Sequence, residues 1–205
     1  ARATNDDFFM FGEVYDSSPT FTSQYTTTAK LQATLDFGFQ NAALGFAQGK
    51  ATTGLRDVYA GDDWYTDADS NAYQLPTFLG NHDMGRIGHF VSADNPGAGD
   101  AEWLARDRLA HELMYLSRGN PVVYYGDEQG FTGDGGDKDA RQDMFPSRVA
   151  SYNDDDLIGT DATTADALAS ACAQIAETLP ISGVIVFTGS GSTARRVARE
   201  RPGAP

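Results

Sequence analysis

Acidic side chains follow apolar, strand-like runs at three places in the chain. Glu13 follows "FFMFG", Asp83 follows "TFLGNH", and the pair Asp127 and Glu128 follows "VVYYG". In parallel β/α folds the active site gathers at the carboxyl ends of the strands, so these carboxylates are expected to converge. Two carboxyl groups together could perform acid/base chemistry on a glycosidic or similar bond. Taken singly, each is more simply explained as a strand-end cap or a salt-bridge partner, and only their repetition favours catalysis.

Short apolar runs separated by helical segments must position these acids. We predict strands within residues 7–16, 33–39, 75–83 and 120–130, and helices over 22–32 and 100–119. Strands that alternate with helices in this way predict parallel β/α units.

The segment 100–119 carries the clearest helical pattern, with Asp100 as the expected N-cap and Gly119 at its end. Its predicted apolar side consists of Trp103, Leu104, Leu109, Leu113, Met114 and Leu116. From about residue 131 to 164 the composition changes to Gly, Asp, Asn and Thr, which predicts a long loop. A separate helix–strand–helix pattern occupies residues 166–200.

The composition excludes several classes of partner. The 205 residues include 29 acidic and 15 basic side chains, for a formal charge of −14. That charge argues against nucleic acid and against anionic membranes, and it fits a neutral substrate. The single cysteine excludes an internal disulfide and a cysteine-rich zinc site. Neither a signal-peptide pattern after Ala1 nor an apolar run of about 18 residues is present, so we expect a soluble chain, of unassigned location.

Three ordered motifs resemble the α-amylase family of glycoside hydrolases. "MFGEVYD" is similar to the glutamate motif of that family, "FLGNHDMGR" to its Asn-His-Asp motif, and "GNPVVYYGDEQG" to its Gly-x-Pro-x-x-Tyr-Tyr-Gly-Asp-Glu segment. "DKDARQDMF" (137–145) also resembles the stretch that comes directly after that segment in the family. The resemblance covers residues 1–164 and implies an α/β fold, a partial TIM (β/α)8 barrel made of strands five to eight.

The resemblance also implies roles for individual residues. Glu13 would be the general acid/base, and its apolar neighbours Phe11 and Val14 would help to hold its carboxyl protonated. Asp83 would be the second catalytic acid, which binds sugar hydroxyls and stabilises the oxocarbenium-like transition state. His82 would hydrogen-bond the same sugar.

Two further residues of the motif, Asn81 and Arg86, would bind substrate or orient the neighbouring groups, and for Arg86 a structural salt bridge is the stronger alternative. Tyr124 and Tyr125 are better explained as barrel packing than as sugar platforms. Trp64 and Tyr65, in "DWYTD", could stack on a sugar ring, but an exposed or core position is the better explanation of these aromatic residues. The implied partner is an α-glucan or oligosaccharide.

One half of the family's chemistry does not appear in the sequence. A retaining glycosidase needs an acid/base and a nucleophile about 5 Å apart. The family's nucleophilic aspartate lies in a Gly-x-Arg-x-Asp motif on strand four, and no stretch here matches it. We therefore expect no turnover from this chain alone, and no certain cofactor or metal, although calcium is possible in the complete family enzyme. A partial barrel would also leave strand edges and an apolar face uncovered, at a cost in stability.

The last segment, 165–205, resembles the C-terminal domain of pyruvate kinase and predicts a small three-layer α/β fragment. "VIVFTGSGSTARRVARERPGAP" places a turn rich in glycine and hydroxyl groups between a strand and a helix. Such a turn suits a phosphate, although a capped, solvated turn needs no ligand. The candidate effector-binding residues are Thr188, Ser190, Gly191, Ser192 and Thr193.

Three alternatives compete with a glycosidase. A metallophosphoesterase also carries Gly-Asn-His-Asp, but its other metal-binding motifs are absent and the chain has only three histidines. "GDGGDKD" (133–139) fits a calcium loop poorly, because Phe145 stands where an EF-hand requires Glu. The third alternative is a non-catalytic remnant that binds a carbohydrate or a phosphorylated effector.

Overall fold

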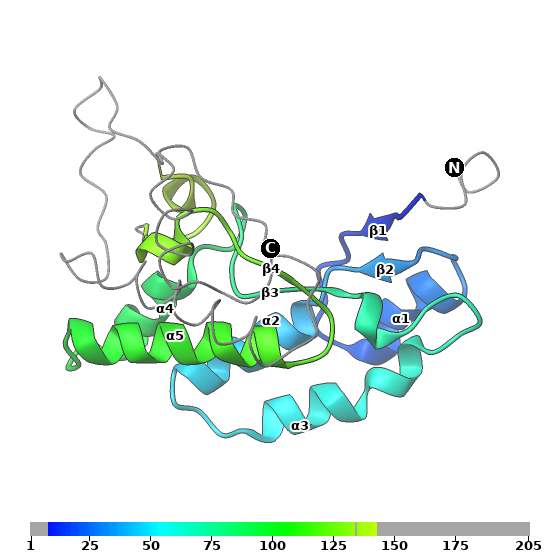
Figure 1. Ribbon diagram of the computed structural model, residues 1–205, viewed down its shortest axis with the longest axis horizontal. Coiled ribbons are helices and arrows are strands. Elements are labelled where there is room, and N and C mark those ends of the chain that lie inside the picture. Colours follow the sequence, from blue (N-terminus) through cyan, green and yellow to red (C-terminus); the bar gives the residue numbers. More distant parts are fainter. Residues whose placement is uncertain (1–7, 134, 143–205) are drawn as a thin grey trace, which may run out of the picture. The chain divides into compact units, whose positions relative to one another are not determined.

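The computed structural model describes residues 8–133 and 135–142. The chain divides into two compact units, one made of residues 1–78 and 117–122 and the other of 79–116 and 123–205 (Figure 1). The candidate phosphate turn at 188–193 and the fragment 165–205 lie outside the described residues.

Parallel strand pairs organise the first unit. Strand β1 (Phe11–Gly12) pairs parallel with β2 (Ala33–Thr34), and β3 (Pro76–Phe78) pairs parallel with β4 (Asn120–Val122). A hydrogen bond of 3.0 Å, from the backbone N–H of Asp36, just after β2, to the Pro76 carbonyl of β3, links the two pairs. The predicted parallel β/α arrangement is confirmed for these strands.

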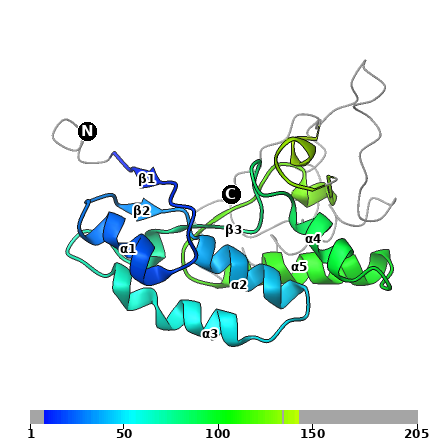
Figure 2. The same cartoon turned by 180° about the vertical axis from the view of Figure 1, so that it is seen from behind.

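Three helices lie on one side of these strands in both views (Figures 1 and 2). Helix α1 (Pro19–Thr27) begins earlier than the predicted helix 22–32, because proline fits the first helical position. Helix α2 (Phe37–Ala47) begins inside the segment 33–39, for which the sequence predicts a strand. Helix α3 (Thr53–Ala60) comes next in the chain.

Asp36 explains why the predicted strand at 33–39 is wrong beyond Thr34. Its side-chain Oδ1 accepts a hydrogen bond of 2.9 Å from the backbone N–H of Phe39. An aspartate at the N-cap satisfies a helical donor that would otherwise have no partner, so the chain turns into a helix there.

The strands differ in burial, since β3 is buried throughout whereas β4 is exposed throughout. The Phe78 ring of β3 meets the Phe37 ring edge-on at a centroid distance of 5.2 Å. The apolar runs at 7–16 and 120–130 suit buried strands, but Phe8, Phe9 and Phe11 are 45%, 46% and 53% exposed, and β4 is exposed along its length. Among the described strands, β1 has a neighbour on one edge only.

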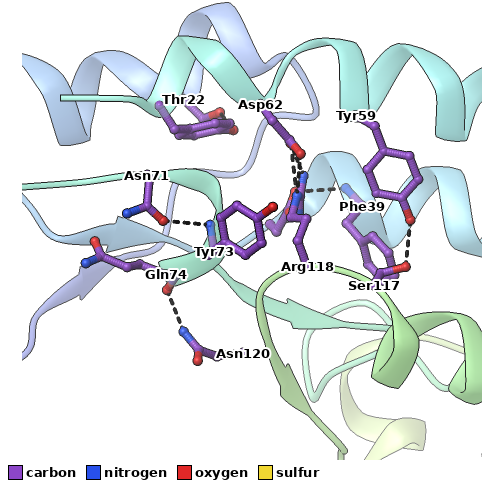
Figure 3. A network of polar contacts seen from close by, with 12 residues as sticks. Thr22, Phe39, Tyr59, Asp62, Asn71, Tyr73, Gln74, Ser117, Arg118 and Asn120 are labelled. Carbon is purple, nitrogen blue, oxygen red and sulfur yellow. Dashed lines mark hydrogen bonds and ion pairs between the residues drawn. The ribbon is translucent and has the colours of Figure 1, made fainter. Parts of the chain in front are cut away.

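A polar network connects helix, loop and strand segments of the first unit (Figure 3). Arg118 donates from Nε and Nη2 to Asp62, at 2.7 to 3.0 Å, and from Nη1 to Asp36. Burial disfavours its charge, but these two carboxylates outweigh that effect and raise the pKa of Arg118. Elsewhere in this network, the hydroxyl groups of Tyr59 and Ser117 form a hydrogen bond of 2.7 Å.

The second unit contains helices α4 (Ile87–Asp94) and α5 (Asp100–Leu116), followed by the short helices η3 (Asp127–Gln129) and η4 (Asp137–Ala140). Asp100 is the first residue of α5 and not its N-cap. None of the helices among the described residues is both long and apolar enough to cross a bilayer.

The predicted apolar side of α5 is only partly correct. Its buried residues are Asp107, Ala110, His111 and Met114. Leu109 and Leu116, assigned to the apolar side, are 42% and 62% exposed. The helix therefore directs two ionisable side chains inward, towards partners in other segments.

Candidate active site

The Asn-His-Asp motif forms a tight turn that its own asparagine holds together. The Asn81 Oδ1 accepts hydrogen bonds from the backbone N–H groups of Asp83, at 3.0 Å, and Met84, at 2.8 Å. The backbones of Asn81 and Gly85 exchange two further bonds, of 3.1 and 3.2 Å. A side chain at Gly80 would meet the Gly85 carbonyl oxygen at 2.5 Å, so glycine is required for this approach. Asn81 therefore shapes the turn, in agreement with an orienting role.

The same turn presents His82 and Asp83 together at the surface. His82 Nε2 lies 3.3 Å from Asp83 Oδ2, and the two side chains are 54% and 46% exposed. Two adjacent polar groups with free surface can hydrogen-bond a polyhydroxyl ligand, which suits the predicted sugar subsite.

Arg141 lies against the turn, although the sequence motifs alone did not single it out. Its Nη2 lies 3.2 Å from Asp83 Oδ1 and 3.0 Å from Asp137 Oδ1. Arg141 belongs to the segment "DKDARQDMF", whose resemblance to the family could have pointed to it. The resemblance gave no role to any residue of that segment. In the second unit Asp83 thus lies between an imidazole and a guanidinium.

Arg86 is fully buried beneath this turn. Its Nη1 donates to Asp127 Oδ1 at 2.8 Å and to the Tyr125 carbonyl at 2.7 Å. Its guanidinium carbon lies 4.4 Å from the centre of the Tyr124 ring and 5.2 Å from that of Phe131. This geometry favours the salt-bridge interpretation of Arg86, and it also favours packing over sugar stacking for Tyr124.

The third acidic strand end does not present free carboxylates. Asp127 is 2% exposed, and burial raises its pKa to about 7, although His111 and Arg86 act in the opposite direction. Glu128 turns back on its own segment, where its Oε2 accepts a hydrogen bond of 2.8 Å from the Gly126 backbone. The structure therefore assigns Asp127 to a buried ion pair and Glu128 to a local cap.

Glu13 lies in the first unit, immediately after β1, and is exposed. Its neighbour Phe11 is exposed as well, so the apolar enclosure expected around the carboxyl is not present. Asp83 lies in the second unit, and the convergence of the two carboxyl groups stays a prediction.

The two aromatic residues Trp64 and Tyr65 have different surroundings. Trp64 is 59% exposed, whereas Tyr65 is buried with its hydroxyl 2.5 Å from Thr22 Oγ1. Burial raises the pKa of Tyr65 to about 12. Tyr65 is therefore a core residue and not a sugar platform.

Within residues 8–133 and 135–142, no three side chains of the His, Cys, Asp or Glu type come together as metal ligands.

Comparison with known proteins identifies the class to which this fold and turn belong. Residues 1–167 match the family described as "Alpha amylase, catalytic domain", and residues 166–205 match "Pyruvate kinase, alpha/beta domain". The chain belongs to the α-amylase family, and its C-terminal segment is similar to the second of these domains.

Individual relatives support the same assignment. An α-amylase of Streptomyces lividans is 61% identical over 168 residues, which are 82% of this chain and 18% of that protein. A β/α-amylase of Paenibacillus polymyxa is 32% identical, over 66% of this chain and 11% of its own length. The crystal structure of an Anoxybacillus α-amylase matches with a TM-score of 0.59 at 26% identity, over 68% of this chain and 29% of that one. The chain thus spans less than a third of the length of each.

Proposed function

We propose that this chain carries the acid/base and sugar-binding part of a glycoside hydrolase or transglycosidase that acts on α-glucosidic bonds with retention. The observation that carries the proposal is the turn in which Asn81 holds His82 and Asp83 at the surface, with Arg141 against the Asp83 carboxylate. The names of the relatives, α-amylase and β/α-amylase, agree with an α-glucan or maltooligosaccharide as substrate.

In the proposed reaction Glu13 donates a proton to the glycosidic oxygen as the bond from that oxygen to the anomeric carbon breaks. A carboxylate nucleophile forms a glycosyl ester at the same carbon. Glu13 then takes a proton from the water that cleaves the ester, or from an acceptor hydroxyl in a transglycosidase. Asp83 and His82 hold the sugar hydroxyls, while Asn81 and Arg86 maintain the turn.

The nucleophile decides what the chain does by itself. No Gly-x-Arg-x-Asp motif occurs in the sequence, so we propose that the isolated polypeptide binds the sugar without cleaving it. Strands β1, β2, β3 and β4 would correspond to strands five to eight of the family barrel, within a domain 1–164. The segment 165–205 would form the pyruvate-kinase-like fragment.

A binding remnant without catalysis is the second candidate, and the exposed His82–Asp83 pair favours it. In that case the turn at Thr188, Ser190, Gly191, Ser192 and Thr193 would be a separate site for a phosphorylated effector. Calorimetry with a sugar phosphate distinguishes the two sites, because Asp83→Asn would weaken binding of a neutral maltooligosaccharide and leave binding of the phosphate unchanged.

The test of the main proposal combines turnover with binding. The purified chain is incubated with a chromogenic maltooligosaccharide, and binding of an uncoloured maltooligosaccharide is measured by calorimetry. We expect binding without release of the chromophore. Asp83→Asn should reduce the affinity, whereas Asp57→Asn, at a carboxylate 64% exposed in another part of the chain, should not.

Two results would contradict this scheme. Turnover that Glu13→Gln abolishes would show that the chain is a complete catalyst. An affinity that Asp83→Asn leaves unchanged would remove the turn from the binding site.

A further inference from the structure

Four ionisable side chains are buried together in the second unit. Arg86, Asp107, His111 and Asp127 are 0%, 2%, 1% and 2% exposed, respectively. They come from separate segments: the residue that precedes α4, two successive turns of α5, and the start of η3. Buried charges are costly unless they are paired, so a cluster of this kind requires a reason beyond packing.

The contacts inside the cluster form two pairs, one within α5 and one between Arg86 and Asp127 beside the candidate sugar-binding turn. His111 Nδ1 lies 3.0 Å from the Asp107 carbonyl oxygen and 3.7 Å from Asp107 Oδ1. Because a carbonyl oxygen can only accept, Nδ1 carries a proton. Asp127 in turn accepts from Arg86 Nη1, and Arg86 lies three positions after Asp83.

Asp127 has a special position among the contacts of Arg86. Within the described residues, Nε and Nη2 of Arg86 have no hydrogen-bond partner, and the guanidinium faces the rings of Tyr124, Tyr125 and Phe131. The Asp127 carboxylate is therefore the one ion-pair partner that the described structure gives to this buried cation.

The charge of the cluster changes near neutral pH. Burial raises the pKa of Asp127 to about 7; His111 and Arg86 oppose this rise, and Asp107 adds to it. Burial also raises the pKa of Asp107. The groups that face Asp127 are thus Arg86 before α4 and both Asp107 and His111 on α5.

We propose that Asp127 is a positioning residue, whose ionised carboxylate clamps Arg86 and so fixes the turn that presents His82 and Asp83. Asp107 and His111 set the pH at which the clamp engages. When Asp127 takes up a proton, its carboxyl group becomes neutral, the buried guanidinium loses its counter-charge, and the turn loosens. The inference deepens the proposed function, since that turn is the proposed sugar subsite, but its test requires no sugar.

The experiment uses NMR to follow the methionine methyl groups of the full chain, in which the methyl carbons are isotopically labelled. The sequence has four methionines, of which Met84 lies in the turn and Met114 is buried on α5. Met84→Leu assigns the first signal and Met114→Leu the second. In the wild type we expect both signals to shift with an inflection near pH 7.

Three substitutions distinguish a clamp from a merely structural contact. Asp127→Asn should abolish the inflection of the Met84 signal, while His82→Gln should retain it and so exclude titration of the nearby imidazole as its cause. Asp107→Asn should move the inflection to lower pH and His111→Gln to higher pH. Each displacement should be about one pH unit, the effect of a unit charge at roughly 10 Å in a medium of effective dielectric constant about 20.

Circular dichroism establishes which variants are folded. If Asp127→Asn does not fold, the opposite displacements in Asp107→Asn and His111→Gln decide the question. The inference is overturned if the inflection appears at Met114 and not at Met84, because the cluster would then titrate without moving the turn. It is equally overturned if the inflection persists in folded Asp127→Asn, or if Asp107→Asn and His111→Gln displace it in the same direction. If the wild type does not bind the maltooligosaccharide but the Met84 signal behaves as expected, the proposed function is contradicted and the present inference is not.

Discussion

The guanidinium of Arg141 lies 3.2 Å from the carboxylate of Asp83, across 58 positions of sequence. Both side chains are about half exposed, at 49% and 46%. An exposed ion pair contributes little to folding, but here one partner belongs to the proposed sugar site. A substitution at Arg141 should therefore change sugar binding while leaving the free energy of unfolding nearly unchanged.

We expect Arg141→Ala to weaken maltooligosaccharide binding about fivefold, equivalent to about 1 kcal/mol, because Asp83 loses the group that holds its carboxylate. The free energy of unfolding should change by less than about 1 kcal/mol. Calorimetry and urea titration measure the two quantities. Lys138→Ala removes a positive charge from η4, the short helix that ends just before Arg141, and is the control. If both variants lose affinity equally, the effect comes from the loss of a nearby positive charge and not from the contact between Arg141 and Asp83.

Arg118 predicts a large loss of stability in the first unit. Its side chain is 7% exposed and pairs with Asp36 and Asp62. Arg118→Ala should lower the free energy of unfolding by about 3 to 5 kcal/mol, because it leaves buried carboxylate charge unpaired. Arg56→Ala removes an ion pair whose side chains are 72% and 64% exposed, and it should cost less than about 1 kcal/mol. Urea unfolding of both variants checks the contrast, and similar costs would refute it.

The raised pKa of Asp127 predicts how stability varies with pH. In the folded protein this carboxyl has a pKa above its ordinary value of 3.8, so the fold favours its protonated form. The resulting stabilisation is complete below pH 3.8 and is lost as the pH rises towards about 7. The stability of the wild type relative to Asp127→Asn should thus fall between about pH 4 and 7, by at most about 4 kcal/mol. Urea titrations at several pH values measure it. A difference that is constant or rises over this range would contradict the shift.

Gly126 predicts a backbone effect beside the same cluster. Its φ is 88°, and a Cβ atom there would lie 2.4 Å from the Phe131 ring. Gly126→Ala should therefore lower the free energy of unfolding by about 1 to 3 kcal/mol, through strain and through displacement of a ring that faces Arg86. Gly97→Ala is the control, since a Cβ atom there has nothing within 4 Å. A cost within about 0.5 kcal/mol for both variants would show that the ring adapts freely.

Local features were predictable from the sequence where the interactions that decide them are local. The Asn-His-Asp turn is held by hydrogen bonds that span two or three residues, so its motif already contains its structure. The N-cap at Asp36 is equally local, but it lies inside "ATLDFGF", a short apolar run for which we predicted a strand.

Interactions between distant residues could not be predicted in the same way. Helical periodicity placed Leu109 and Leu116 on the inner side of α5, whereas the structure buries Asp107 and His111. The reason lies in Arg86 and Asp127, which are 41 residues apart and create a charged interior that apolar patterns do not report. The parallel order of the strands was predicted, because it follows from the alternation of element types alone.

The two oxygens of Asp36 have separate functions, and this limits what evolution can place there. Oδ1 accepts from the Phe39 backbone, while Oδ2 pairs with Arg118. Asparagine would keep the first contact and lose the charge, serine or threonine would cap the helix with a single oxygen, and glutamate would place both oxygens one methylene too far. Among the natural amino acids only aspartate meets both demands, so position 36 should be one of the least substitutable sites of the chain.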